Sequence, residues 1–147
     1  MVTRITEVTL DQLIQDIKGY TEKSNTEIVK TNGALHVFVY GTLKKGRGNN
    51  SLLKSSEFIG EGKTVNKYAL YTTGIPFVIA SQKVSHISGE LYSVDDETLL
   101  NLDRLEGHPD WYHREITKVE VDGKIYNAYM YFYPKPIGSL IKSGIYV

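Results

Sequence analysis

Alternating apolar and polar positions predict that this chain is built mostly from short β-strands. Runs rich in β-branched and aromatic residues are bounded by glycine, asparagine or proline, which is the pattern of strands separated by turns. We expect strands at residues 36–40, 58–65, 68–71, 77–80, 86–92, 116–121 and 126–133. Asp122-Gly123 separates the last two runs, and an Asp-Gly pair in this position is a strong signal for a β-hairpin.

One stretch of the core has helical spacing instead, and we expect a helix that ends near residue 106. Its markers are regularly spaced leucines, acidic residues in the first turn, and a glycine and a proline beyond the end: Leu99, Leu102, Leu105, Asp96, Glu97, Gly107 and Pro109. Ser93 or Asp95 can cap it. Leu52 and Leu53 suggest a further short helix or turn, whereas the tail at 137–147 has no clear pattern. Many strands with few helices predict an α+β fold with a closed or strongly curved mixed sheet.

Residues 1–33 read as an N-terminal extension to a domain that spans 34–147. Thr9 and Gln12 can form a capping box, and Gly19 supplies a stop signal. Between them an apolar stripe recurs at helical spacing: Leu10, Leu13, Ile14 and Ile17. This short helix docks on the domain surface or, if its stripe is exposed, binds a partner.

Composition narrows the class of protein. The 147 residues include 17 basic and 17 acidic side chains, so no overall field attracts nucleic acid or an anionic membrane. The chain has no cysteine, which excludes disulfides, thiol nucleophiles and thiolate metal sites. It shows no leader and no run of membrane-spanning length. We therefore expect a cytoplasmic protein that binds neither nucleic acid nor membrane.

Tyr40-Gly41-Thr42-Leu43 is the first candidate for chemistry, because a buried strand stops there at a glycine. The loop at 44–50 is rich in glycine and asparagine, which tolerate positive φ angles. Such a turn can aim several backbone N–H groups at one anion. A strand end with a tight turn and no ligand is an equally good interpretation. A Walker A loop is excluded, since Arg47-Gly48 stand where Lys-Ser/Thr is required.

Glu106 is the candidate acid–base group. It stands at the carboxyl end of the predicted helix, where the helix dipole mildly disfavours a carboxylate. Burial would raise its pKa further, and a carboxyl group tuned upward can accept and return a proton near neutral pH. From this motif alone, a solvated glutamate at a frayed helix end is the simpler interpretation.

The sequence gives little support for a metal site, a serine-hydrolase site or a nucleic-acid-binding site. The four histidines have no metal-ligand spacing: His36, His86, His108 and His113. No Gly-x-Ser-x-Gly elbow is present. The 11 tyrosines could stack on nucleic-acid bases, but their strand spacing and the neutral net charge favour core packing and pocket walls.

Four motifs, in this order and spacing, resemble the γ-glutamylcyclotransferase-like superfamily. They are Tyr40-Gly41-Thr42-Leu43-Lys44-Lys45-Gly46, Gly89-Glu90-Leu91-Tyr92, Leu102-Asp103-Arg104-Leu105-Glu106-Gly107 and Tyr112-His113-Arg114. The resemblance is closest to the γ-glutamylamine cyclotransferase and AIG2-like branch. It covers roughly residues 35–133 and leaves out residues 1–33.

The resemblance implies a small mixed β-barrel with flanking helices and an enzyme that releases 5-oxoproline from a small γ-glutamyl amine or amide. It implies no cofactor and no metal. The family's substrate-binding turn corresponds to Tyr40, Gly41, Thr42 and Leu43, and its acid–base glutamate corresponds to Glu106. Further pocket positions correspond to Tyr112 and to the segment Ile75-Pro76-Phe77.

Two rival functions keep the same fold. A module that binds a small anionic ligand would use the turn at 40–43 and give Glu106 no acid–base task, so an ordinary low pKa for Glu106 would favour it. An interaction protein would act through residues 1–33. The leaving amine and the oligomeric state are not specified by these motifs.

Overall fold

The computed structural model describes residues 35–41, 43–108 and 110–146. The helix predicted within residues 1–33 and the domain boundary at 34 lie outside them. In chain order the elements are β1 (Leu35–Val39), the 3-10 helix η1 (Asn50–Leu53), β2 (Glu57–Thr72), β3 (Pro76–Ile79), β4 (Ser85–Val94), α3 (Asp96–Glu106), β5 (His113–Val121), β6 (Lys124–Phe132) and β7 (Ser139–Ile141).

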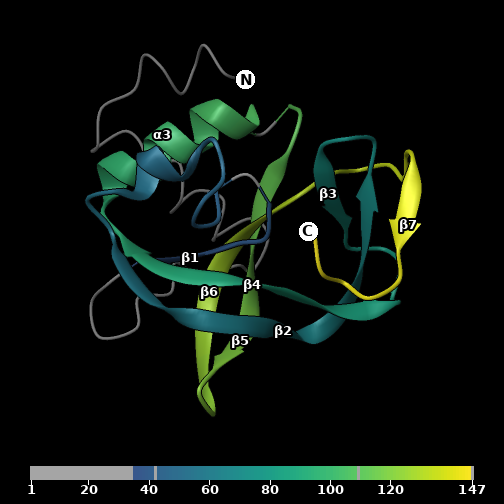
Figure 1. The fold of residues 1–147 in the computed structure, drawn as a ribbon. Coiled ribbons are helices and arrows are strands. Elements are labelled where there is room, and N and C mark those ends of the chain that lie inside the picture. Colours follow the sequence, from purple (N-terminus) through teal and green to yellow (C-terminus); the bar gives the residue numbers. More distant parts are fainter. Residues whose placement is uncertain (1–34, 42, 109, 147) are drawn as a thin grey trace, which may run out of the picture.

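Five of the strands close into a small mixed barrel (Figure 1). Their order is β2-β4-β1-β6-β5, and β2 pairs with β5 to complete the ring. β1 runs parallel to β6, while the other pairs are antiparallel. Gly62 makes the closure possible, because a Cβ atom there would collide with the carbonyl oxygen of Glu120. The predicted α+β fold with a mixed barrel is confirmed.

β2 corrects one expectation. The runs at 58–65 and 68–71 were predicted as two strands, but they form a single strand whose pairing with β4 shifts register between Lys63 and Lys67. Thr64 lies within this irregular segment, and its side chain forms the hydrogen bonds there. Its hydroxyl donates to the carbonyl oxygen of Asn66 at 2.7 Å and accepts from the amide of Ile87 at 2.9 Å. The strand therefore bends without ending.

The second half of β2 leaves the barrel and forms a small sheet with β3 and β7 (Figure 1). Leu70 lies between the two neighbours, opposite Val78 on one side and Ile141 on the other. β7 was not predicted, since it has three residues and none of them is buried. The β2–β3 hairpin matters for the site, because Ile75 and Pro76 lie at its turn.

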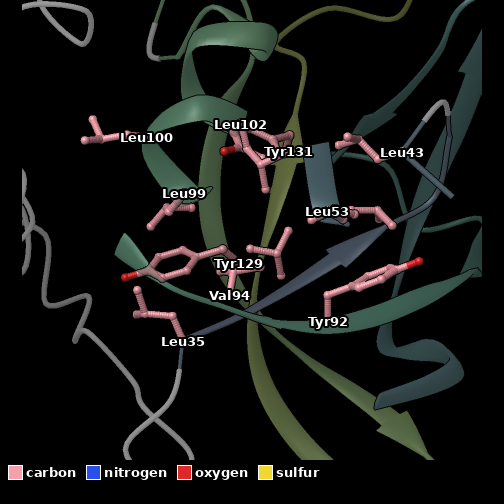
Figure 2. Packing of buried hydrophobic residues seen from close by; sticks show 12 residues of the cluster. Leu35, Leu43, Leu53, Tyr92, Val94, Leu99, Leu100, Leu102, Tyr129 and Tyr131 are labelled. Atoms are coloured by element: carbon pink, nitrogen blue, oxygen red, sulfur yellow. The ribbon is translucent and has the colours of Figure 1, made fainter. Parts of the chain in front are cut away.

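α3 begins and ends where its sequence predicted. Of the two candidate caps, Asp95 is the one used: its Oδ1 accepts from the amide of Thr98 at 2.7 Å. Gly107 ends the helix in the left-handed conformation at φ 70°, which a glycine adopts without steric cost. Figure 2 shows Leu99 near Tyr129, and Leu102 beside Tyr131, in the layer between helix and sheet.

β1 is buried on both faces and joins the two parts of the core. Leu35, Val37 and Val39 pack in the cluster under α3. The alternate residues Phe38 and Tyr40 belong to a second cluster that draws on all five barrel strands, so it fills the barrel interior. The end of β1 is thus held from both sides, which gives the turn that follows a fixed position.

The predicted hairpin at Asp122-Gly123 joins β5 to β6. Both turn residues have positive φ angles, 50° and 79°, as a two-residue hairpin turn requires. Among the helices that the structure describes, none is long and apolar enough to cross a membrane.

Candidate active site

A pocket opens where β1 ends, between the turn after β1, the β2–β3 hairpin and the end of α3. It holds about 390 Å³ of empty space, including its open mouth. The lining residues are Phe38, Val39, Tyr40, Gly41, Leu43, Ile75, Pro76, Glu106, Tyr112 and Tyr131. Seven of the nine predicted site residues are among them; of the other two, Thr42 lies outside the described residues and Phe77 does not line the pocket. The structure thus brings together predicted site residues that are up to 72 positions apart in sequence, from Tyr40 to Tyr112.

Gly41 is required by close packing. A Cβ atom at this position would lie 2.6 Å from Cγ of Pro76, so only glycine lets the turn and the hairpin meet. The carbonyl oxygen of Gly41 accepts from the amide of Lys44 at 3.0 Å, which turns the chain sharply. Phe77, predicted beside Ile75 and Pro76, is instead buried in a separate cluster and does not line the pocket.

The loop after the turn is fastened to β4 by side chains. Asn50 Nδ2 donates to the carbonyl oxygen of Leu43 at 2.8 Å and to the hydroxyl of Tyr92 at 3.2 Å. Glu90 Oε1 accepts from the Tyr92 hydroxyl at 3.1 Å and from the amide of Lys45 at 2.9 Å. These contacts give a structural reason for the Gly89-Glu90-Leu91-Tyr92 motif: two of its side chains hold the loop.

The last residues of the chain also touch both pocket loops. Lys44 Nζ donates to the carbonyl oxygen of Tyr146 at 3.0 Å, and the Tyr146 hydroxyl donates to the carbonyl oxygen of Gly74 at 3.2 Å. The Arg47 guanidinium lies 5.2 Å from the centre of the Tyr146 ring. The tail, unassigned from sequence, therefore bridges the glycine loop and the β2–β3 hairpin.

Glu106 is the one carboxylate among the described residues that line the pocket. Burial, together with the negative charge of Asp103, raises its pKa from 4.5 to about 7. Burial and the nearby Glu106 charge in turn raise the phenol pKa values of Tyr40 and Tyr112, so both phenols are neutral donors. The pocket thus presents one titratable group poised near neutral pH.

Tyr112 ties the helix end to the hairpin. Its amide donates to the carbonyl oxygen of Glu106 at 3.2 Å, and its hydroxyl donates to the carbonyl oxygen of Pro76 at 3.2 Å. Its ring packs edge-on against Tyr133, with ring centres 5.5 Å apart. Tyr112 therefore forms a wall of the pocket and sets the separation of Glu106 from Pro76.

Two residues near Glu106, Asp103 and Arg114, had no individual role assigned from the sequence, and Tyr131 was predicted only as one of the tyrosines of the core and pocket walls. Asp103 is completely buried and accepts from Arg114 Nε and from the Tyr131 hydroxyl. A signal for it was present, since Asp103 lies four residues after Leu99, on the apolar face of α3. A carboxylate on such a face implies a buried partner.

The histidines do not gather into a metal site. His108 accepts a hydrogen bond at Nδ1 from the amide of Arg114 at 3.2 Å, and burial lowers its pKa to about 4. His113 pairs with Glu115 at 2.5 Å. Within residues 35–41, 43–108 and 110–146, no three His, Asp or Glu side chains converge as a metal ion would require.

Known proteins share this architecture. The family described as gamma-glutamyl cyclotransferase, AIG2-like, matches residues 37–147. The "putative gamma-glutamylcyclotransferase" of Methanocaldococcus jannaschii is 51% identical over 113 residues, which cover 76% of this chain and 94% of that one. The gamma-glutamylaminecyclotransferase of Rattus norvegicus is 37% identical over 95 residues, or 58% of this chain and 64% of that one.

The fold comparison agrees with these relatives. The crystal structure of an AIG2-like protein from Mus musculus superimposes with a TM-score of 0.61 at 32% identity, covering 67% of this chain and 76% of that one. Sequence and fold together confirm the predicted enzyme class, a cyclotransferase. The chain therefore belongs to the AIG2-like gamma-glutamyl cyclotransferase family.

Proposed function

We propose that this protein releases 5-oxoproline from a γ-glutamyl amine or amide, with Glu106 as the general acid and base. One observation carries the proposal: a carboxyl group with a pKa of about 7 lies in the same pocket as the glycine turn. A group with this pKa can accept a proton and return it within one catalytic cycle. Membership of the family, and the name of the rat relative, support the same reaction.

The reaction is an intramolecular displacement. The α-amine nitrogen forms a bond to the γ-carbonyl carbon, and the bond from that carbon to the leaving nitrogen breaks. Glu106 takes the proton from the attacking amine and delivers it to the leaving nitrogen. The products are 5-oxoproline and a free amine, and no water is consumed. Since both reacting groups belong to one molecule, most of the catalytic task is to hold it folded back on itself.

The other pocket residues have binding roles in this proposal. Backbone N–H groups of the turn hold the substrate α-carboxylate: Tyr40, Gly41, Thr42 and Leu43. The apolar wall packs on the glutamyl methylenes and shields the proton transfer from water: Ile75, Pro76 and Tyr112. The rigid link from Tyr112 to Pro76 supports this role, because it keeps the wall at a constant distance from Glu106.

The test is release of 5-oxoproline from a panel of γ-glutamyl amines, γ-glutamyl-lysine and γ-glutamyl dipeptides. Wild type is compared with Glu106→Gln, which keeps the size of the side chain and removes its acid–base function. Glu57→Gln is the matched control, because Glu57 is exposed at the start of β2 and does not line the pocket.

We expect release by wild type and by Glu57→Gln, and a loss of about 10²–10⁴-fold in Glu106→Gln. Near-full activity in a folded Glu106→Gln would overturn its assignment as acid–base. If folded wild type releases nothing from the whole panel but binds its members, the pocket belongs to a ligand-binding module. The preferred substrate would name the leaving amine.

A further inference from the structure

Asp103 is a buried carboxylate whose partners are all built into the fold. Its side chain has no exposed surface. Arg114 Nε donates to both of its oxygens, at 2.8 and 3.1 Å, and the Tyr131 hydroxyl donates to Oδ1 at 2.6 Å. The Arg114 side chain is itself buried and lies 4.9 Å from the centre of the Tyr129 ring. The Asp103 end of the ion pair is therefore closed to water, and Arg114 is nearly so.

A contribution to the stability of the fold does not by itself explain why the chain has a buried ion pair here. Removing two charges from water is expensive, and well-packed apolar residues of similar volume often serve the fold as well or better. A buried ion pair beside a catalytic pocket is more readily explained by its effect on the groups in that pocket.

Two sets of hydrogen bonds connect Asp103 to the pocket, one through Tyr131 and one through His108. Tyr131 lines the pocket, donates to Asp103 and accepts from the Tyr40 hydroxyl at its carbonyl oxygen, at 2.9 Å. His108 donates its amide to the carbonyl oxygen of Asp103 at 2.9 Å and accepts from the amide of Arg114. Asp103 is thus joined to the end of β1 and to the chain that follows Glu106.

The charge of Asp103 also acts on Glu106 directly. The two residues lie three positions apart on α3, so they share one face of the helix. The Asp103 carboxylate contributes, after burial, to the raised pKa of Glu106. The other titratable groups packed around this pair are phenols with raised pKa values, an imidazole with a lowered one and the paired guanidinium: Tyr40, Tyr112, Tyr129, Tyr131, His108 and Arg114.

We propose that Asp103 is a positioning residue for this reaction: held by Arg114 and Tyr131, its carboxylate fixes the end of α3 and sets the protonation state in which Glu106 meets the substrate. It touches no substrate itself. The catalytic part of this inference rests on the proposed function, but the coupling between Asp103 and Glu106 can be measured without turnover.

The experiment is an NMR titration of the Glu106 carboxyl carbon in wild type, Asp103→Asn and Glu97→Gln, with the pH profile of kcat/KM measured beside it. Asp103→Asn keeps the shape of the side chain and removes its charge. Glu97→Gln is the matched control, since it removes an exposed carboxylate from the same helix and does not line the pocket.

We expect the titration midpoint of Glu106 to be lower in Asp103→Asn than in wild type by about half a pH unit or more. The acid limb of the pH profile of kcat/KM should shift to lower pH by the same amount. Glu97→Gln should leave the midpoint in place. An unmoved midpoint in folded Asp103→Asn, or an equal shift in Glu97→Gln, would overturn the proposal. If Asp103→Asn fails to fold because Arg114 is left unpaired, Asp103→Asn/Arg114→Gln removes both charges. The Glu106 midpoint should then still fall, but by less, because the loss of the Arg114 cation acts in the opposite direction, and a midpoint that does not fall would overturn the proposal.

The two proposals fail separately. If no γ-glutamyl compound is turned over but the Glu106 midpoint still falls in Asp103→Asn, the coupling holds and the reaction is wrong. If turnover depends on Glu106 but its midpoint is indifferent to Asp103, the reaction holds and the role of Asp103 is wrong.

Discussion

Gly41 lies so close to Pro76 that a Cβ atom at position 41 would stand 2.6 Å from the proline Cγ. This contact joins the turn after β1 to the β2–β3 hairpin. Tyr112 holds the same proline from the helix side, through a 3.2 Å hydrogen bond to its carbonyl oxygen. The turn, the hairpin and the end of α3 therefore form one rigid frame around Glu106.

Gly41→Ala should disrupt this frame while leaving Glu106 unchanged. The added methyl group must push Pro76 away, which displaces the wall of the pocket. We expect KM to rise by about tenfold or more, because catalysis here depends on holding the substrate in one conformer. Steady-state kinetics with the best γ-glutamyl substrate provide the measurement.

Gly48→Ala is the control for this change. Gly48 lies in the same loop, and a Cβ atom there would meet nothing within 4 Å. Its KM should equal that of wild type. Equal KM values for Gly41→Ala and wild type would show that the pocket does not depend on the Gly41–Pro76 contact.

The pH dependence of the wild-type enzyme follows from Glu106. Its pKa is raised from 4.5 to about 7, so the group is mostly protonated below neutral pH and then cannot act as a base toward the substrate amine. We expect kcat/KM to rise with pH through about 7 and then to level off. A profile whose acid limb lies near 4.5 would mean that Glu106 is solvated or is not the base.

The same raised pKa predicts that the fold is less stable at alkaline pH than it would be without Glu106. Since the folded-state pKa exceeds the unfolded one, protonation favours folding; this stability is complete below pH 4.5 and is lost as pH rises through about 7. Glu106→Gln should thus match wild type in acid and exceed it by up to about 3 kcal/mol at about pH 8.

Denaturant unfolding at both pH values measures this difference. Glu57→Gln, which changes an exposed carboxylate, should show no such gap between the two conditions. A Glu106→Gln variant that is no more stable than wild type in alkali would contradict the burial of a charged carboxylate at this position.

The candidate site was predictable from sequence because its residues occur in short motifs. The glycine turn and the helix end each combine a structural signal with a chemical one, and Ile75 and Pro76 follow from the family pattern. Asp103 was not assigned a role, because the sequence of α3 does not show that Arg114 and Tyr131 reach it from β5 and β6. Such long-range pairs depend on how the barrel closes.

The elements of the fold could be predicted where local sequence signals are strong. The prediction failed where tertiary contacts decide the structure. The cap at Asp95, the stop at Gly107 and the Asp122-Gly123 hairpin are all local, and all three are confirmed. β7 pairs with β2 only because the tail packs back on the second half of β2, outside the barrel. Asn66-Lys67 was interpreted as a break, yet β2 continues because side-chain hydrogen bonds hold it to β4.

Thr64 is the residue that makes this continuity possible, and it yields the last prediction. Its hydroxyl is buried, donates to the carbonyl oxygen of Asn66 and accepts from the amide of Ile87. Thr64→Val keeps the shape and leaves both backbone groups without this partner, so it should lower the free energy of unfolding by about 1–3 kcal/mol. Thr64→Ser keeps the hydroxyl and should lose less stability.

Denaturant unfolding of the two variants is the measurement. If the Thr64→Val variant is as stable as the Thr64→Ser variant, the bend in β2 does not depend on the hydroxyl. Because Thr64 does not line the pocket, kcat/KM of the folded Thr64→Val variant should equal that of wild type.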